Sequence, residues 1–145
     1  MRLNTRIGVI AGAAVVALGS ATFASAAEAK TFNLTAGAGV TNGKAHGKGT
    51  VKFVAAKRVR IQGTIDDICP KDGYGAYIEF KVNLAGGGYG TIVKRDTRKC
   101  EPKAPVRYDF AQSFPRRVVS VGVTVIEIDA DTGKIGDAAR KLITR

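Results

Sequence analysis

The chain is poor in the residues that most catalytic and metal centres need. Its 145 residues include one histidine, two cysteines, one methionine and no tryptophan. So few nitrogen and sulfur ligands argue against haem and against most zinc sites. After residue 26 the only serines are Ser113 and Ser120, and the only histidine, His46, lies in a Gly/Lys-rich segment that we expect to be a flexible loop. Because nucleophilic catalysis needs a nucleophile held beside a base, we predict a protein that is not an enzyme and has no cofactor.

Long apolar runs are also missing, except at the N-terminus. Arg2 and Arg6 precede an uncharged stretch over Ile7–Phe23, and the small residues Ala24–Ala26 follow it. This order is typical of a secretory signal peptide, cleaved after residue 26 or at a second site that ends at Ala29. A signal anchor is the alternative, but the stretch is at the lower limit for a membrane span and is diluted by glycine. We therefore predict a secreted protein, without stable membrane insertion after cleavage and with cell-wall association as an option.

Helical patterning is absent from the rest of the chain, where apolar and polar residues alternate instead. Alternation with period 2 is the mark of half-buried strands. The apolar rows are Val51, Phe53 and Ala55; Val59, Ile61 and Ile65; Ala76, Ile78, Phe80, Val82 and Leu84; Val106, Tyr108 and Phe110; Val119, Val121, Val123 and Val125. We predict an all-β fold, an antiparallel β-sandwich of Ig-like or jelly-roll-like type with seven or eight short strands.

The expected organisation has three parts. Residues 1–26 form the signal peptide helix, residues 27–48 form a Gly-rich N-terminal arm with at most one short strand over Thr31–Leu34, and residues 49–145 form the β-sandwich domain. Within that domain Gly86–Gly88 supplies the positive φ angles of a reversal, which predicts a hairpin around it.

Two cysteines in a small exported domain are expected to pair. Cys69 and Cys100 flank the predicted hairpin, so a disulfide between them would tie its open end. In the chain-entropy model such a loop contributes about 3–4 kcal/mol of stability. Two free buried thiols are the alternative.

The one global bias is positive charge. The formal net charge is +11, and removal of Arg2 and Arg6 with the signal peptide leaves +9. A basic domain attracts polyanions. The densest clusters supply the candidate anion-binding residues, which are Lys57, Arg58, Arg60, Lys94, Arg95, Arg98 and Lys99. A generally basic surface without a site is the alternative.

Acidic residues offer only a weak metal candidate. Asp129 and Asp131, with Gly133 and Asp137, partly match a calcium loop, but the glycine is displaced and the distant Glu is missing. Since Asp and Gly are ordinary turn residues between strands, we predict no metal site.

Three segments resemble the small secreted proteins, mostly uncharacterised, of soil actinobacteria: the Arg-initiated signal peptide, the run Ile65–Tyr77 and the C-terminal valine strand. The resemblance covers most of residues 47–145 and implies a secreted β-sandwich in which the Asp-Gly-x-Gly-Ala-Tyr segment opens a central strand. It also implies a second cysteine pair near Ile126 and Ala138, where this chain has none, so the last hairpin should be looser. No functional residue carries over.

Two functions remain open at this point. We favour a monomeric extracellular protein that binds an anionic partner, such as a cell-wall polymer or another secreted protein. Nucleic acid is not favoured, because stacking aromatics are not interleaved with the basic residues. The alternative is an inhibitor or toxin-like protein that acts on a secreted enzyme or competitor through the proline-stiffened loop over Glu101–Val106.

Overall fold

The computed structural model describes residues 28–37, 43–68, 75–96, 104–128 and 135–145. These residues form strands and turns and contain no helix. Accordingly, none of them belongs to a helix that could cross a membrane. The strands are β1 (Ala29–Ala36), β2 (Lys44–Ala55), β3 (Arg58–Ile68), β4 (Ala76–Leu84), β5 (Tyr89–Asp96), β6 (Val106–Ser113), β7 (Val118–Ile128) and β8 (Ile135–Thr144).

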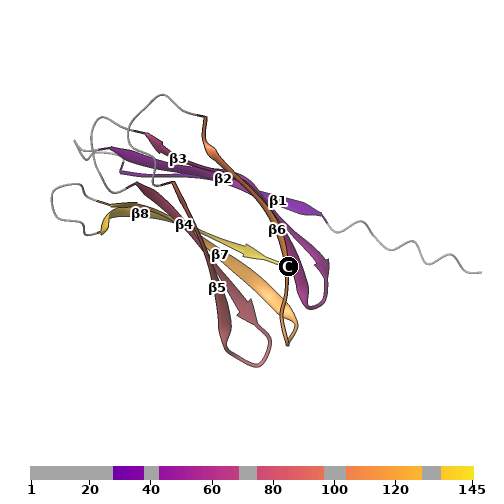
Figure 1. The fold of residues 1–145 in the computed structure, drawn as a ribbon. Helices are drawn as coiled ribbons and strands as arrows, with labels where there is room; N and C mark the ends of the chain where they lie inside the picture. Colours follow the sequence, from indigo (N-terminus) through magenta and orange to yellow (C-terminus); the bar gives the residue numbers. More distant parts are fainter. Residues whose placement is uncertain (1–27, 38–42, 69–74, 97–103, 129–134) are drawn as a thin grey trace, which may run out of the picture.

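The strands form two four-stranded antiparallel sheets, which lie one over the other in a sandwich-like arrangement (Figure 1). Sheet A has the order β1-β2-β3-β6, and sheet B has the order β5-β4-β7-β8. Three consecutive strands therefore build most of sheet A before the chain crosses to the β4–β5 hairpin. It then returns to sheet A with β6 and ends in sheet B.

The core lies between the sheets because each strand buries every second residue. On β4 the buried residues alternate with outward-facing polar ones, giving Ile78, Phe80 and Val82 as the central row. Phe80 is the centre of an aromatic cluster, with ring centroids 5.9 Å from Phe32 and 5.6 Å from Tyr108 in edge-to-face geometry. This geometry stabilises aromatic pairs beyond the area that they bury.

Glycines in sheet A make room for this cluster. Gly49 on β2 pairs with Gly63 on β3, so no side chain separates the two backbones from the aromatic rings. A Cβ placed on Gly49 would lie 2.9 Å from the Phe32 ring, and one on Gly63 would lie 2.6 Å from the Tyr108 hydroxyl. The glycines are therefore a packing requirement of the core.

Lysines lie along both seams between the sheets. At the β1–β8 seam, Lys30 Nζ donates to the Thr144 carbonyl oxygen at 2.8 Å, and Lys141 Nζ donates to the Thr31 carbonyl oxygen at 2.9 Å. At the β5–β6 seam the Lys94 ammonium lies 5.0 Å from the centre of the Phe110 ring. Charges that point inward on edge strands discourage pairing with other chains.

The all-β fold and the predicted hairpin are confirmed. Gly86, Gly87 and Gly88 all have positive φ, and the turn is closed by hydrogen bonds between Leu84 and the glycines. In place of a loose arm over residues 27–48, β1 and the first half of β2 are paired strands of sheet A. The signal peptide predicted over residues 1–26 lies outside the described residues.

Candidate anion-binding face

The seven cations that were predicted from the sequence to bind anions do not form one site. Lys57 lies in the β2–β3 turn, and Arg58 and Arg60 lie on the outer face of sheet A. Lys94 points into the β5–β6 seam, whereas Arg95 lies on the outer face of sheet B with its guanidinium 4.8 Å from the centre of the Tyr77 ring. Arg98 and Lys99 lie outside the described residues. The predicted set is therefore divided between the two sides of the molecule.

A larger group of cations gathers on the outer face of sheet A. We call it the basic face and define it by side chains that alternate with buried core residues on β2, β3 and β6, and are therefore directed to solvent. Its members are Lys44, Lys48, Lys52, Arg58, Arg60 and Arg107. The carboxylates on the same face of these strands are Asp66 and Asp109.

The cations of the basic face are spread over a grid. Lys48 and Arg107 share one row, separated by Thr64, so their Cα atoms lie about 10 Å apart across two strand spacings. Lys48 and Lys52 are four residues apart along one strand, which is about 13 Å. No aromatic side chain lies on this face in the described strands of sheet A. The face is not uniform, since a hollow of about 540 Å³ lies at Arg58, Arg60 and Asp109, with Val54 among the residues that line it.

Arg60 is the one cation of this face that is already held by a carboxylate. Its Nε and Nη2 donate to the two oxygens of Asp109 at 3.0 and 2.7 Å, and Gln62 donates to the same carboxylate at 2.8 Å. The bond from Arg60 holds the pKa of Asp109 below its usual value. The other cations of the basic face form no ion pair with a described residue, so their charge is available to a ligand.

His46 is also on this face, and the expectation of a flexible loop around it is wrong. It lies on β2 between Lys44 and Lys48, and its Nε2 is 2.6 Å from Asn33 Oδ1. The segment is a strand because it pairs with β1 on one side and β3 on the other, and Gly47 leaves room there for Val125 and Ile78 of the opposite sheet.

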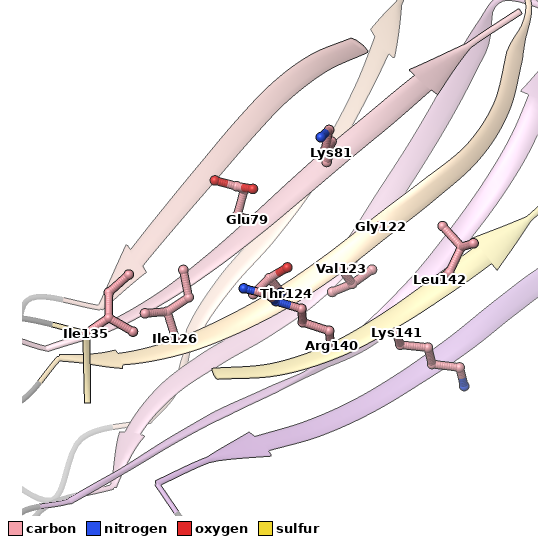
Figure 2. Close-up of a pocket in the computed structure, with 10 residues that line it drawn as sticks. All are labelled: Glu79, Lys81, Gly122, Val123, Thr124, Ile126, Ile135, Arg140, Lys141 and Leu142. Atoms are coloured by element: carbon pink, nitrogen blue, oxygen red, sulfur yellow. The ribbon is translucent and has the colours of Figure 1, made fainter. Parts of the chain in front are cut away.

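The outer face of sheet B has a different character. A hollow of about 540 Å³ lies over β4, β7 and β8 (Figure 2). Ile126 and Ile135 lie next to each other at one end of it and Leu142 lies at the other, with Gly122 between them (Figure 2). Sequence reasoning did not find this hollow, since its residues come from three strands.

The remaining predicted sites lie outside the described residues. These are the Cys69–Cys100 pair, the calcium candidates Asp129 and Asp131, and Glu101–Lys103 of the proposed inhibitory loop. The Cys69–Cys100 disulfide therefore stays a prediction. Among the described residues no three His, Cys, Asp or Glu side chains are grouped so that they could hold a metal ion.

No protein-family model, no curated protein and no solved structure matches the chain. The residues missed at first were Lys44, Lys48, Lys52 and Arg107. A signal for the first three was present, because a spacing of four residues places all of them on one face of a strand.

Proposed function

We propose that the protein is a secreted binding protein whose basic face holds an anionic polymer of the bacterial cell wall. The observation that carries the proposal is the group of cations on the outer face of sheet A. Arg60 is held by Asp109 and the others carry no ion pair with a described residue. Export is inferred from the N-terminal pattern of Arg2, Arg6 and the Ala-rich cleavage site.

The spacing of the cations favours a polymer over a small anion. A single phosphate or carboxylate is bound tightly when several donors converge on it. On the basic face Lys52 and Arg60 are direct partners across β2 and β3, but Arg60 is already held by Asp109. Lys44, Lys48 and Arg107 are about 10–13 Å from the nearest other cation, so one small group cannot be held by all of them. A flexible chain with repeated negative charges satisfies them one after another. Affinity then comes from many weak contacts and depends strongly on salt.

The same face argues against single-stranded nucleic acid. Binding of unpaired bases uses aromatic platforms between the basic residues. The aromatic residues of sheet A, Phe32, Phe53, Tyr108 and Phe110, lie on the inner side with the core. A polymer with repeated phosphate or carboxylate groups and no bases fits this chemistry better.

The connectivity is consistent with an immunoglobulin-like fold, which we infer in preference to a jelly roll. The supporting observations are the β3–β6 pair in one sheet and the order β5-β4-β7-β8 in the other. They correspond to the B–E pair and the C′-C-F-G order of that fold, with β1 as an additional edge strand. Such folds are common extracellular scaffolds, but the fold itself does not define a ligand.

The test is retention of the purified protein on isolated Gram-positive cell wall at rising salt concentration. We expect retention that falls with salt and that is lost when the phosphate polymer is stripped from the wall. The double variant Lys48→Glu/Lys52→Glu should weaken retention at low salt by at least about tenfold, since each cation near an anionic surface contributes about 1 kcal/mol.

The matched control is Arg95→Glu/Arg117→Glu, which makes the same change of net charge away from the basic face. It should keep most of the retention, because Arg95 lies on sheet B and Arg117 in the turn before β7. Equal losses in both double variants would mean that only overall charge matters. Undiminished retention on stripped wall would exclude the polymer as the ligand.

A further inference from the structure

The outer face of sheet B combines exposed apolar side chains with sparse charge. Tyr89, Ile135 and Leu142 are 62, 63 and 62% exposed on this side of the molecule. Ile126 and Gly122 add apolar surface between β4 and β8. Exposed apolar side chains that lie together, as Ile126 and Ile135 do, are a feature of interaction surfaces.

The charged residues at the centre of this face are arranged symmetrically about β7. Thr124 on β7 pairs with Glu79 on β4 on one side and with Arg140 on β8 on the other. Glu79 and Arg140 are thus two strands apart, about 10 Å between Cα atoms, and they do not form an ion pair with each other. Figure 2 shows Arg140 extending toward Thr124, with Glu79 on the neighbouring strand.

The other cations of this face are occupied within the same chain. The Lys81 ammonium lies 4.1 Å from the centre of the Tyr89 ring, and the Arg95 guanidinium is stacked on Tyr77. Glu79 and Arg140 therefore remain as the two opposite charges with which a partner surface can form ion pairs.

We propose that a second copy of this chain covers the outer face of sheet B, giving a two-fold symmetric dimer. A two-fold axis that runs along β7 exchanges the β4 side of one copy with the β8 side of the other. Glu79 of each copy then faces Arg140 of the other, which forms two intermolecular ion pairs around Thr124. Self-complementary contacts of this kind are what a two-fold interface requires. The dimer replaces the monomer expected from the sequence.

The size of the face indicates a modest affinity. With the axis along β7, only β4, β7 and β8 of each copy overlap, because β5 lies beyond the edge of the partner's sheet. Three strands about 4.8 Å apart with a rise of about 3.3 Å per residue give a surface of roughly 14 by 30 Å, so two copies bury about 850 Å² together. This is below the size of stable interfaces and in the range of weak, transient ones. We therefore expect a dimer that dissociates on dilution.

The dimer would give the protein a cross-linking role, a step that rests on the proposed function. Sheets A and B lie on opposite sides of each copy (Figure 1), so pairing through sheet B directs the two basic faces away from each other. Each dimer could then hold two polymer chains, whereas a monomer could hold one.

Sedimentation velocity over a range of concentrations tests the dimer directly. We expect Glu79→Arg and Arg140→Glu each to weaken dimerisation at least about tenfold, because each change places like charges opposite one another at both symmetric positions. The double variant Glu79→Arg/Arg140→Glu exchanges the charges and should restore the dimer. Lys48→Glu is the matched control on sheet A and should dimerise as the unchanged protein does, and circular dichroism should show the β structure in every variant.

A monomer at every accessible concentration, single variants that dimerise normally, or a double variant that stays monomeric would each overturn the proposal. Light scattering from soluble poly(glycerol phosphate) separates it from the proposed function. The unchanged protein should raise the scattering, while Arg140→Glu should be retained on immobilised polymer without raising it. A protein that dimerises but is not retained would refute the cell-wall function alone, and a dimer that is retained without bridging would refute the cross-linking role.

Discussion

Replacement of Gly63 by alanine gives the sharpest test of how sheet A is packed. The new Cβ would lie 2.2 Å from the Lys48 carbonyl oxygen and 2.9 Å from the Gly49 Cα, both of which are backbone atoms of the paired strand. A carbon and an oxygen not bonded to each other need more than 3 Å, so β2 and β3 would have to separate by most of an ångström. The Tyr108 hydroxyl is also close, at 2.6 Å, but the two backbone contacts cannot be relieved by a change of rotamer.

The expected cost follows from that geometry. Overpacking of a filled core costs about 1–3 kcal/mol, and we place this change at the upper end because the clash is with backbone. Loss of unfolded-state freedom on replacing glycine offsets only about 0.4–1 kcal/mol of it. The net loss of about 2–3 kcal/mol corresponds to a fall in Tm of roughly 10 °C for a domain of this size.

The assay is thermal and urea unfolding followed by circular dichroism, with Gly122→Ala as the matched control. A Cβ on Gly122 would lie 3.8 Å from its nearest neighbour, the Cβ of Lys81, so alanine fits there without strain. Measured in dilute solution, Gly122→Ala should be neutral or slightly stabilising. Equal stability of the two variants would refute the argument that the Gly49–Gly63 pair is required by the packing of the core.

Three further predictions concern the core, one exposed carboxylate and the seam lysine. Phe80→Ala should cost about 3–5 kcal/mol in urea unfolding, because it removes the ring at the centre of the aromatic cluster; a loss below 1 kcal/mol would contradict that role. Backbone N–H groups of Gly37 and Ala138 donate to Asp137 and lower its pKa from 3.8, so its stabilisation is present above that pH and is lost as the pH falls through the folded-state value. Asp137→Ala should therefore lower Tm at neutral pH by an amount that shrinks in acid, and a difference that is independent of pH would contradict this. Lys94→Gln should leave wall retention unchanged, since the Lys94 ammonium lies over an aromatic ring in the β5–β6 seam. A loss of retention as large as that of the basic-face variants would show that Lys94 contacts the polymer.

The strands could be predicted from the sequence because their burial alternates so regularly. The rows on β4 and β7 follow period 2 almost without interruption, and Gly86–Gly88 marks the turn by its chemistry. The first half of β2 could not be recognised in this way. Lys44, His46 and Lys48 alternate there with Ala45 and Gly47, which are buried only because bulky residues of sheet B occupy the space above them.

The clusters of cations that stand out in the sequence are not the ones that the fold places on one face. Clusters of adjacent cations stand out in a sequence, but adjacent residues on a strand point to opposite sides. Lys94 therefore lies in the β5–β6 seam, whereas Arg95 lies on the outer face of sheet B. The basic face gathers instead from residues spaced two or four apart on strands that only the sheet order brings together, as Lys48 and Arg107 show.

The strand order also decides when this chain can fold. β3 finds its second neighbour only in β6, Ile61 opposite Phe110, and β4 finds its second neighbour only in β7, Ile78 opposite Val125. The lysine bonds that close the β1–β8 seam join residues 110 and 114 positions apart. The hairpins β1-β2-β3 and β4-β5 can form between chain neighbours, but neither sheet is complete until the last three strands have joined. Closure of the sandwich is therefore expected to be the slow step of folding, since it waits for the pairings of greatest sequence separation.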